Sequence, residues 1–241
     1  MFYRFLLSCC RIEMFYTGVC DEKKLIAAAE KLVGGIDRTP TISVTTERFV
    51  RKRDEVVEIT EEMEVAQGKL ILGFCSDHTV SDSDYTAYSL FNELFGGSPT
   101  SKLFENVREK MSLCYYCRSI PEAHKGILTV ASGIEVENRD KAVSEILLQL
   151  ENTRNGIISD EELVSAKKAL IYSYRELFDD AANLSFWYLS RLIGGSEKTI
   201  ETVIEEIEKV TKEDIAKCAK ATQLDTIYFL KGTLKDGGDA E

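Results

Sequence analysis

Two residues near the middle of the chain carry side chains that suit the binding of a carbonyl oxygen. Arg108 and Tyr115 are seven residues apart, and the pattern predicts that Arg108 lies late in a helix and Tyr115 in the strand that follows. A turn between these elements can bring a fixed cation and a neutral phenol near one cavity. Both groups donate hydrogen bonds to a carbonyl oxygen or a developing oxyanion. The spacing alone favours an ordinary structural role, in which Arg108 pairs with Glu105 or Glu109 and Tyr115 belongs to the core.

The histidines and cysteines test for a zinc site in this chain. A helix of the H-x-x-E-H or H-E-x-x-H type needs two histidines one turn apart, whereas the two histidines here are 46 residues apart. A C-x-x-C lies at 114–117, in an apolar strand-like run where its two cysteines would face opposite sides. We therefore expect no metal in this chain. A zinc-binding module stays open as an alternative, with the candidate ligands Cys75, His78, Cys114 and Cys117.

Two further motifs resemble catalytic or phosphate-binding loops without matching them. The segment Gly96-Gly97-Ser98-Pro99 lacks a second glycine directly before Lys102 and follows a helix rather than a strand. The pattern favours a break between two helices. Ser132 has no glycine two residues before it, so it is not the nucleophile of a G-x-S-x-G turn.

Composition narrows the class of partner and the compartment. The 241 residues include 41 acidic and 30 basic ones, giving a net charge of −11, which disfavours nucleic acid and anionic membranes as partners. The seven cysteines are an odd number, which fits free thiols in a reducing cytoplasm. The apolar run at 5–10 is too short for a signal peptide, and no stretch reaches the roughly 18 apolar residues of a membrane span. We expect a cytoplasmic protein.

The hydrophobic pattern predicts the elements that position these side chains. Strands are expected at 12–19, 56–63, 69–75, 113–118, 126–134 and 225–231. Helices are expected at 21–33, 82–95, 101–111, 139–155, 160–192 with a break near 179–180, 197–208 and 212–221. Asp21 is expected to cap its helix, and capping boxes are expected at Ser81 with Asp84 and at Ser159 with Glu162. The strand 69–75 is almost continuously apolar, which suggests burial on both faces.

The order of these elements predicts the α+β class, with neighbouring strands paired as hairpins and helices packed on one face of the sheet. The segment 36–53 contains Pro40 and mixed polar residues, so it is predicted to be a connector at a domain boundary. We divide the chain into a strand-plus-helix segment at 1–38, a main domain at 39–233 and a polar tail at 234–241.

The central motifs resemble those of the insulinase-like zinc peptidases, the family of pitrilysin and the mitochondrial processing peptidases. The segments 95–104, 107–110 and 113–115 are similar to the "GG…SxLF…VRExxxLxY" pattern of the second, non-catalytic homologous domain of that family. Further likeness lies in Gly133-Ile134-Glu135, in 156–162, and in Asp179 with Trp187. The resemblance covers roughly residues 45 to 231 and is greatest to the inactive-looking subunits of bacterial paired genes.

The resemblance implies a metallopeptidase-like sandwich, a mostly antiparallel sheet covered by helices on one face. It also implies that residues 1–38 are the tail of a preceding homologous domain. In that family one domain binds zinc through H-x-x-E-H, and the domain similar to this chain supplies an arginine and a tyrosine that contact the substrate carbonyl. Those positions match Arg108 and Tyr115. The resemblance therefore favours a substrate-binding role for this pair over the ordinary structural role. The substrate-contacting glycine-rich loop of processing peptidases matches Gly96, Gly97 and Ser98, although the loop is short here.

The function implied by the resemblance is that of a non-catalytic, substrate-binding domain or subunit of a zinc metalloendopeptidase. Zinc and the hydrolytic water would be supplied by an HxxEH-bearing domain or subunit, so the chain would not be active alone. The implied partners are that catalytic unit, a peptide or unfolded protein substrate, and a second subunit in a homo- or hetero-dimer. The alternative is a catalytically inactive structural or peptide-binding subunit of the same family.

Overall fold

The computed structural model describes residues 2–39, 41–42, 48–49 and 54–233. Its centre is a five-stranded sheet in the order β1-β5-β2-β4-β3. The strands are β1 (Val57–Met63), β2 (Gly68–Cys75), β3 (Cys114–Glu122), β4 (Ile127–Ile134) and β5 (Gln223–Gly232). β1 runs parallel to β5, and the other three neighbouring pairs are antiparallel. The predicted α+β class with a mostly antiparallel sheet is confirmed.

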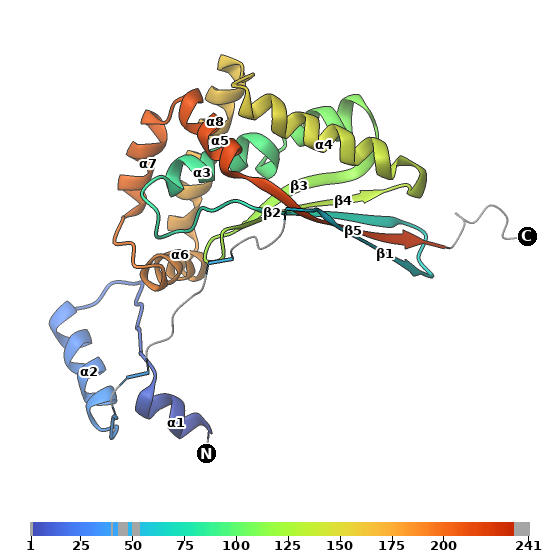
Figure 1. Cartoon of the computed structure of the whole chain (residues 1–241). Helices are drawn as coiled ribbons and strands as arrows, with labels where there is room; N and C mark the ends of the chain where they lie inside the picture. The colour runs from blue at the N-terminus through green and yellow to red at the C-terminus, as the bar shows by residue number, and fades with distance from the viewer. Residues whose placement is uncertain (1, 40, 43–47, 50–53, 234–241) are drawn as a thin grey trace, which may run out of the picture.

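Helices cover one face of this sheet (Figure 1). The layer contains α3 (Tyr85–Asn92), α4 (Arg139–Arg154), α5 (Asp160–Glu176), α7 (Ile200–Lys209) and α8 (Lys212–Ala221). Two π-helical segments, η1 (Glu93–Gly97) and η2 (Phe104–Lys110), join α3 to β3, and the 3₁₀ turns η3 (Val136–Asn138) and η4 (Leu177–Asp179) precede α4 and α6. α6 (Ala181–Ile193) lies at one end of the layer, with α1 (Phe2–Cys9) and α2 (Glu22–Gly34) beyond it, away from the sheet.

Alternation along β2 shows which face of the sheet is covered. Leu70, Leu72 and Phe74 are at most 1% exposed and face the helices, whereas Ile71 and Cys75 on the other face are only half-buried. The expected burial of this strand on both faces is therefore wrong. The reason is that, within the described part of the chain, no helix covers the second face (Figure 1).

A row of aromatic rings anchors the helical layer to the sheet. Tyr85, Tyr88, Phe91 and Phe95 follow one side of α3 and η1, and successive ring centroids are 5.6 to 5.9 Å apart. Tyr88, Phe91 and Phe95 are at most 1% exposed. Offset and tilted ring pairs of this kind add to the free energy gained by burial, so the predicted apolar stripe becomes the centre of the core.

The strand pairing differs from the expected series of hairpins. β3 and β4 form the predicted hairpin, but β1 and β2 are not neighbours, because β5 lies between them. Ile227 and Phe229 of β5 are buried, whereas the glutamates of β1 are exposed. The apolar C-terminal strand therefore takes an inner position, and the polar β1 takes the edge, where its outward side chains stay in water.

Three expectations about local structure are wrong or only partly right. Residues 12–19 form no strand, since no strand of the described sheet lies beside them. The capping box at Ser81 is absent, because the Ser81 hydroxyl donates to the Gly194 carbonyl (2.7 Å) and the Asp84 carboxylate makes no cap. The helix expected at 101–111 is largely π-helical. By contrast, Asp21 caps α2, and the capping box of Ser159 with Glu162 opens α5 as predicted.

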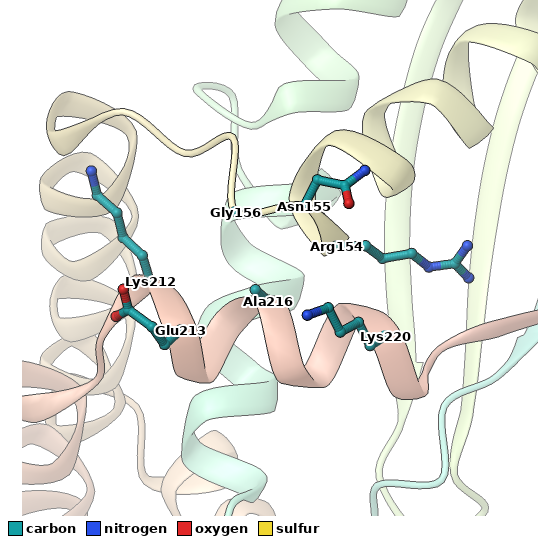
Figure 2. A pocket seen from close by; sticks show the side chains of 7 residues that line it. All are labelled: Arg154, Asn155, Gly156, Lys212, Glu213, Ala216 and Lys220. Carbon is teal, nitrogen blue, oxygen red and sulfur yellow. The ribbon is translucent and has the colours of Figure 1, made fainter.

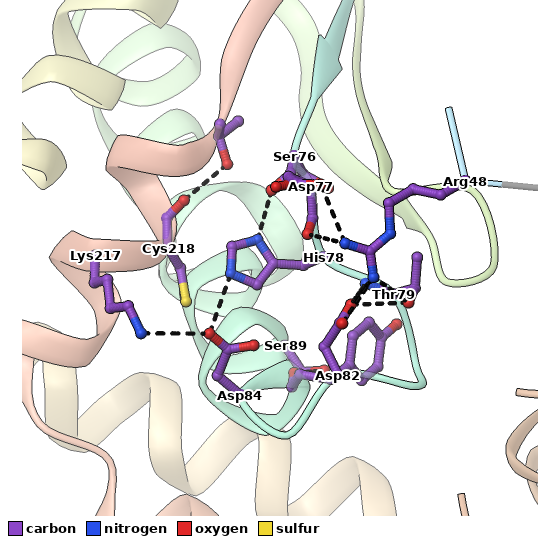
Figure 3. Close-up of polar contacts among 12 residues, drawn as sticks. Arg48, Ser76, Asp77, His78, Thr79, Asp82, Asp84, Ser89, Lys217 and Cys218 are labelled. Carbon is purple, nitrogen blue, oxygen red and sulfur yellow. Dashed lines mark hydrogen bonds and ion pairs between the residues drawn. The ribbon is translucent and has the colours of Figure 1, made fainter. Parts of the chain in front are cut away.

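The Asp84 carboxylate belongs instead to a polar cluster on the β2–α3 loop (Figure 3). It lies 3.6 Å from both His78 Nε2 and Lys217 Nζ. Arg48 donates to the Asp82 carboxylate at 2.6 Å and thereby holds the far side of the loop. The His78 ring stacks on the buried Tyr88 ring with centroids 4.8 Å apart. These contacts give His78 a structural role.

The domain boundaries proposed from the sequence stay predictions. The connector at 36–53 lies partly outside the described residues, and the polar tail at 234–241 lies wholly outside them.

Candidate functional site

The turn between η2 and β3 brings Arg108 and Tyr115 into direct contact. Arg108 Nε donates a hydrogen bond of 2.9 Å to the Tyr115 carbonyl oxygen. The chain reverses through Ser112, which has φ +51° and whose N–H donates to the Arg108 carbonyl at 3.1 Å. β3 is an edge strand, so both residues lie at the border of the sheet. The structure therefore places together the two residues that the sequence paired.

The guanidinium of Arg108 is held by three contacts and keeps a free donor. It lies over the Phe104 ring, 4.6 Å from the centroid, and its Nη1 is 3.1 Å from the Glu109 carboxylate. The pairing with Glu109 that the structural alternative required is therefore present. The side chain is nonetheless 39% exposed, and Nη2 has no partner among the described residues. A fixed cation with an unused donor suits an incoming carbonyl oxygen or carboxylate.

Tyr115 is 58% exposed and does not belong to the core. Its hydroxyl donates a short hydrogen bond to the Glu135 carboxylate. A phenol carries a single proton, so Tyr115 can donate to another oxygen only after it leaves Glu135. Glu135 is thus a neighbour of the Arg108–Tyr115 pair that side-chain chemistry alone does not predict. Its signal in the sequence is the Gly133-Ile134-Glu135 motif, which belongs to the family likeness.

Gly133 in the same motif makes room for the neighbouring Tyr116. A Cβ atom at Gly133 would lie 2.6 Å from Tyr116 Cε1, closer than carbon atoms approach. The ring of Tyr116 therefore lies across the backbone of β4 only because this position is glycine. Ile134 between Gly133 and Glu135 is fully buried. Each residue of the motif thus has a physical role beside the Arg108–Tyr115 pair.

The glycine-rich segment occupies a different place. Gly96 is buried against β3, where an added Cβ would lie 2.7 Å from Ser119 Oγ, and Ser98 is also buried. Gly97 is exposed, but an added Cβ there would lie 2.9 Å from Glu93 Oε2. Ser119 is four residues along β3 from Tyr115, a distance of about 13 Å. The β3 residue that Gly96 contacts is therefore well separated from Tyr115, and Gly96 serves the close packing of η1 on the sheet.

The C-x-x-C motif corrects an expectation about its geometry. A bulge between Cys114 and Tyr116 shifts the register of β3, so Cys114 and Cys117 lie on the same, buried face rather than on opposite faces. A hydrogen bond from the Cys117 thiol lowers the pKa of Cys114 to about 7, with the positive charge of Arg108 acting in the same direction. The same interaction and burial raise the pKa of Cys117.

The alternative of a four-residue zinc module fails on distance. Cys75 lies opposite Ile127 of β4, whereas Cys114 lies opposite Ile134. These positions are seven residues apart along one strand, about 23 Å. The described residues contain no group of three histidine, cysteine or acidic side chains that could hold a metal ion. The donor set of these four residues therefore does not fit zinc.

A basic cleft lies between the C-terminal end of α4 and the length of α8 (Figure 2). It has a volume of about 470 Å³ and is lined by Arg154, Asn155, Gly156, Lys212, Glu213, Ala216 and Lys220. Arg154 donates hydrogen bonds to the carbonyl oxygens of Ala219 (3.2 Å) and Thr222 (2.5 Å). Lys212 pairs with Asp160 at 2.7 Å. The contacts of Arg154 hold the C-terminal end of α8 against α4, and the Lys212–Asp160 pair holds the start of α8 against α5. We therefore assign the cleft a structural role.

Among the described helices, none is both long enough and apolar enough to cross a membrane.

Comparisons with known proteins give this geometry a family. Residues 2–170 match the family model described as the peptidase M16 inactive domain. The chain is 39% identical over 223 residues to a Bacillus subtilis strain 168 protein named "Probable inactive metalloprotease YmfF", covering 92% of this chain and 52% of that protein. The chain thus spans about half the length of this curated relative.

Solved structures agree in fold. A conserved protein from Enterococcus faecalis V583 aligns with a TM-score of 0.78 and 34% identity, covering 90% of this chain and 51% of that one. A peptidase M16 inactive domain from Pseudomonas fluorescens aligns with a TM-score of 0.72 and 20% identity, covering 91% of this chain and 53% of that one. With a matching model that spans well over half of its residues and a relative of this similarity, the chain belongs to the peptidase M16 family, as one of its inactive domains.

Proposed function

We propose that this inactive domain binds peptide substrate for a zinc metalloendopeptidase whose zinc site lies in another domain or subunit. The family match supports a non-catalytic role, and a second relative from Bacillus subtilis, 29% identical, is named "Uncharacterized zinc protease YmxG". The chain covers 52% of the first relative's length and 39% of the second's, which leaves room for a separate catalytic domain. In this proposal, the HxxEH-bearing partner supplies zinc and the hydrolytic water, and this chain supplies binding groups.

The observation that carries the proposal is the free Nη2 donor of Arg108 beside the exposed Tyr115. As a scissile carbonyl becomes an oxyanion, a hydrogen bond from a fixed guanidinium strengthens because both partners are then charged. Tyr115 adds a second donor once its hydroxyl exchanges Glu135 for the substrate oxygen. Phe104 and Glu109 position Arg108, and Glu135 positions Tyr115 before substrate arrives.

The proposal is tested by Arg108→Ala and Tyr115→Phe in the complex with the zinc-bearing partner. Loss of one oxyanion donor typically lowers turnover about a hundred- to a thousandfold. We expect each variant to lower kcat for a peptide substrate by a factor in that range, while circular dichroism shows an unchanged fold. Tyr115→Phe removes a single oxygen atom, so its effect is specific to the hydroxyl.

Arg175→Ala and Tyr172→Phe on α5 are the matched controls, since both side chains are exposed and lie outside the η2–β3 turn. They should leave kcat unchanged. Wild-type rates in both Arg108→Ala and Tyr115→Phe would refute the assigned role.

The second candidate is a catalytically inactive structural or peptide-binding subunit, favoured by the name of the Bacillus subtilis relative. The two candidates differ in what the partner contains. Native mass spectrometry of the complex decides between them: stoichiometric zinc on the partner supports the peptidase, and a metal-free complex that still binds peptide supports the inactive subunit. The same spectrum reports whether the assembly is a homo- or hetero-dimer.

We also propose the cytoplasm as the compartment. All seven cysteines lie in the described part of the chain as free thiols. Free thiols persist in reducing surroundings, and cell fractionation with an antibody against the chain tests this placement.

A further inference from the structure

A cavity on the helical side of the molecule has no role in the function proposed above. It lies between α3, α5 and α6 and has a volume of about 230 Å³. Its lining includes Tyr85, Glu93, Tyr174, Trp187, Ser190 and Arg191. Pro121 of β3 also lines it, six residues along the strand from Tyr115 and therefore about 20 Å away. The cavity is thus separate from the Arg108–Tyr115 pair.

Arg191 is the unusual feature of this cavity. Its side chain is 5% exposed and lies over two aromatic rings, 4.9 Å from the Trp187 centroid and 5.2 Å from the Tyr85 centroid. Within the described residues, the guanidinium of Arg191 makes no ion pair and no side-chain hydrogen bond. The positive charge of Arg191 lowers the pKa of Glu206, but the Glu206 carboxylate is bound by Lys198 at 2.8 Å and by Thr86 at 2.6 Å. A buried cation without a hydrogen-bonded anion is costly. The free donors of Arg191 therefore point to an anionic ligand in the cavity.

The rest of the lining describes the shape of that ligand. Tyr85, Tyr174 and Trp187 form aromatic walls, and Tyr174 meets Trp187 edge to face with centroids 6.1 Å apart. Ser190 adds a hydroxyl group held by His124 Nε2 at 3.0 Å. Drug-sized ligands occupy pockets of roughly 300 Å³ or more, so this smaller cavity fits a molecule of amino-acid size. Such a molecule has one anionic group for Arg191 and an apolar body for the aromatic walls.

We propose that this cavity binds an α-carboxylate attached to an apolar side chain, as a free amino acid or as the last residue of a peptide. The planar guanidinium of Arg191 matches the two oxygens of a carboxylate, and the rings of Tyr85 and Trp187 help to keep it out of water. The apolar side chain packs against Tyr174 and Trp187. This inference stands on residues other than Arg108 and Tyr115, so either can fail without the other.

Trp187 is the single tryptophan of the chain, so its fluorescence reports on this cavity without a label. We would titrate the 241-residue chain with L-phenylalanine, N-acetyl-L-phenylalanine and N-acetyl-L-phenylalaninamide. The two acids should change the emission saturably, and the amide should bind at least about tenfold more weakly, because it lacks the charged partner of Arg191. Tighter binding of the free amino acid indicates that ligand, and tighter binding of the acetylated acid indicates a peptide end. Equal affinity for the acid and amide, or no saturable change with either acid, would overturn the proposal.

Arg191→Met is the variant that tests the residue itself. It replaces the cation by an apolar chain of similar length, and removal of an unpaired buried charge is not expected to unfold the protein. We expect the preference for acid over amide to disappear, whereas Arg175→Met, at an exposed position on α5, should keep it. Unchanged binding of the acid to a folded Arg191→Met variant contradicts the proposal. If that variant does not fold, the comparison of acid and amide on the wild-type chain still decides.

Discussion

At the residue scale, the thiol of Cys114 interacts electrostatically with Arg108 of the proposed substrate-binding pair. Its thiol accepts a hydrogen bond from Cys117, lies near Arg108, and has a pKa lowered to about 7. A pKa near neutrality leaves about half of the thiol as the nucleophilic thiolate at pH 7. Cys114 is half-buried, whereas Cys117 is only 4% exposed. Iodoacetamide at pH 7 should therefore alkylate Cys114 well before Cys117, as peptide mass spectrometry will show.

Three interactions lower the pKa of Cys114: hydrogen bonds with Cys117 and Ser132 and the positive charge of Arg108. Substitution tests the contributions of Cys117 and Arg108. Cys117→Ala removes the larger contribution, so the midpoint of the pH profile for alkylation of Cys114 should move to higher pH. Arg108→Ala removes a smaller contribution of the same sign and should move the midpoint less. Arg175→Ala should leave it in place. A midpoint that is the same in all four proteins would show that neither contact activates the thiol.

The residue types and their spacing along the chain predicted the contact between Arg108 and Tyr115, but not the contact with Glu135. The helix-turn-strand spacing brought Arg108 to Tyr115 as expected, because seven residues are enough to close one turn. Glu135 could not be predicted from spacing, since it reaches Tyr115 only through the pairing of β3 with β4. The bulge after Cys114 was equally hidden, because an alternating pattern of side chains does not show where a strand gains an extra residue.

At the element scale, one ion pair ties the start of η2 to the start of α5. Lys102 is 6% exposed, and its Nζ lies 2.6 Å from Glu162 Oε1, while Glu162 Oε2 accepts from the Ser159 N–H at 2.7 Å. Burial opposes ionisation of Glu162, but the hydrogen bonds from Lys102 and Ser159 outweigh it and hold the pKa below its usual value. Glu162→Gln should lower the free energy of unfolding at pH 7 by about 2 kcal/mol, because it leaves a buried ammonium without its counter-charge.

The pH dependence of this loss has a defined sign. A carboxyl group with a lowered folded pKa stabilises the fold above its unfolded value, about 4.3, and this contribution disappears as the pH falls through the folded pKa. Urea unfolding should therefore show the largest gap between wild type and Glu162→Gln near pH 7, and a shrinking gap below about pH 4. The double variant Lys102→Met/Glu162→Gln should recover part of the loss, since it removes both charges. A gap that is constant from pH 3 to pH 7 would argue against this pairing.

Elements signalled by local chemistry were predicted well, and those that depend on distant partners were not. Ser159 with Glu162 opens α5, and the break expected near 179–180 lies between α5 and α6, which ends one residue beyond the expected position 192. The place of β5 between β1 and β2 could not be predicted in this way, because the residues of 223–232 do not indicate which strands will pair with β5. The strand expected at 12–19 failed for the same reason: a β pattern needs a partner strand to become a strand.

At the scale of the whole molecule, the sheet depends on its C-terminal strand. β5 pairs with both β1 and β2, and Tyr228 donates to Glu61 at 2.8 Å across 167 residues. A chain ending at Thr222 should lack a cooperative unfolding transition, because β1 loses its only neighbour in the described sheet and β2 loses one of two. A chain ending at Thr233 keeps β5 and should unfold cooperatively. Circular dichroism during heating compares them, and a cooperative transition in the shorter chain would contradict this dependence.

The inner position of β5 also sets the order of events while the protein is being made. A ribosome delivers β1, β2, β3 and β4 first, and the strand that joins β1 to the others emerges last. Until then a nascent chain presents unpaired strand edges to the crowded cell, which is the state most exposed to chaperones and to association with other chains. The mean sequence separation of the contacts in this sheet is correspondingly high, and such topologies fold slowly. We therefore expect the sheet to be completed only after β5 has been synthesised, and not when the earlier helices form.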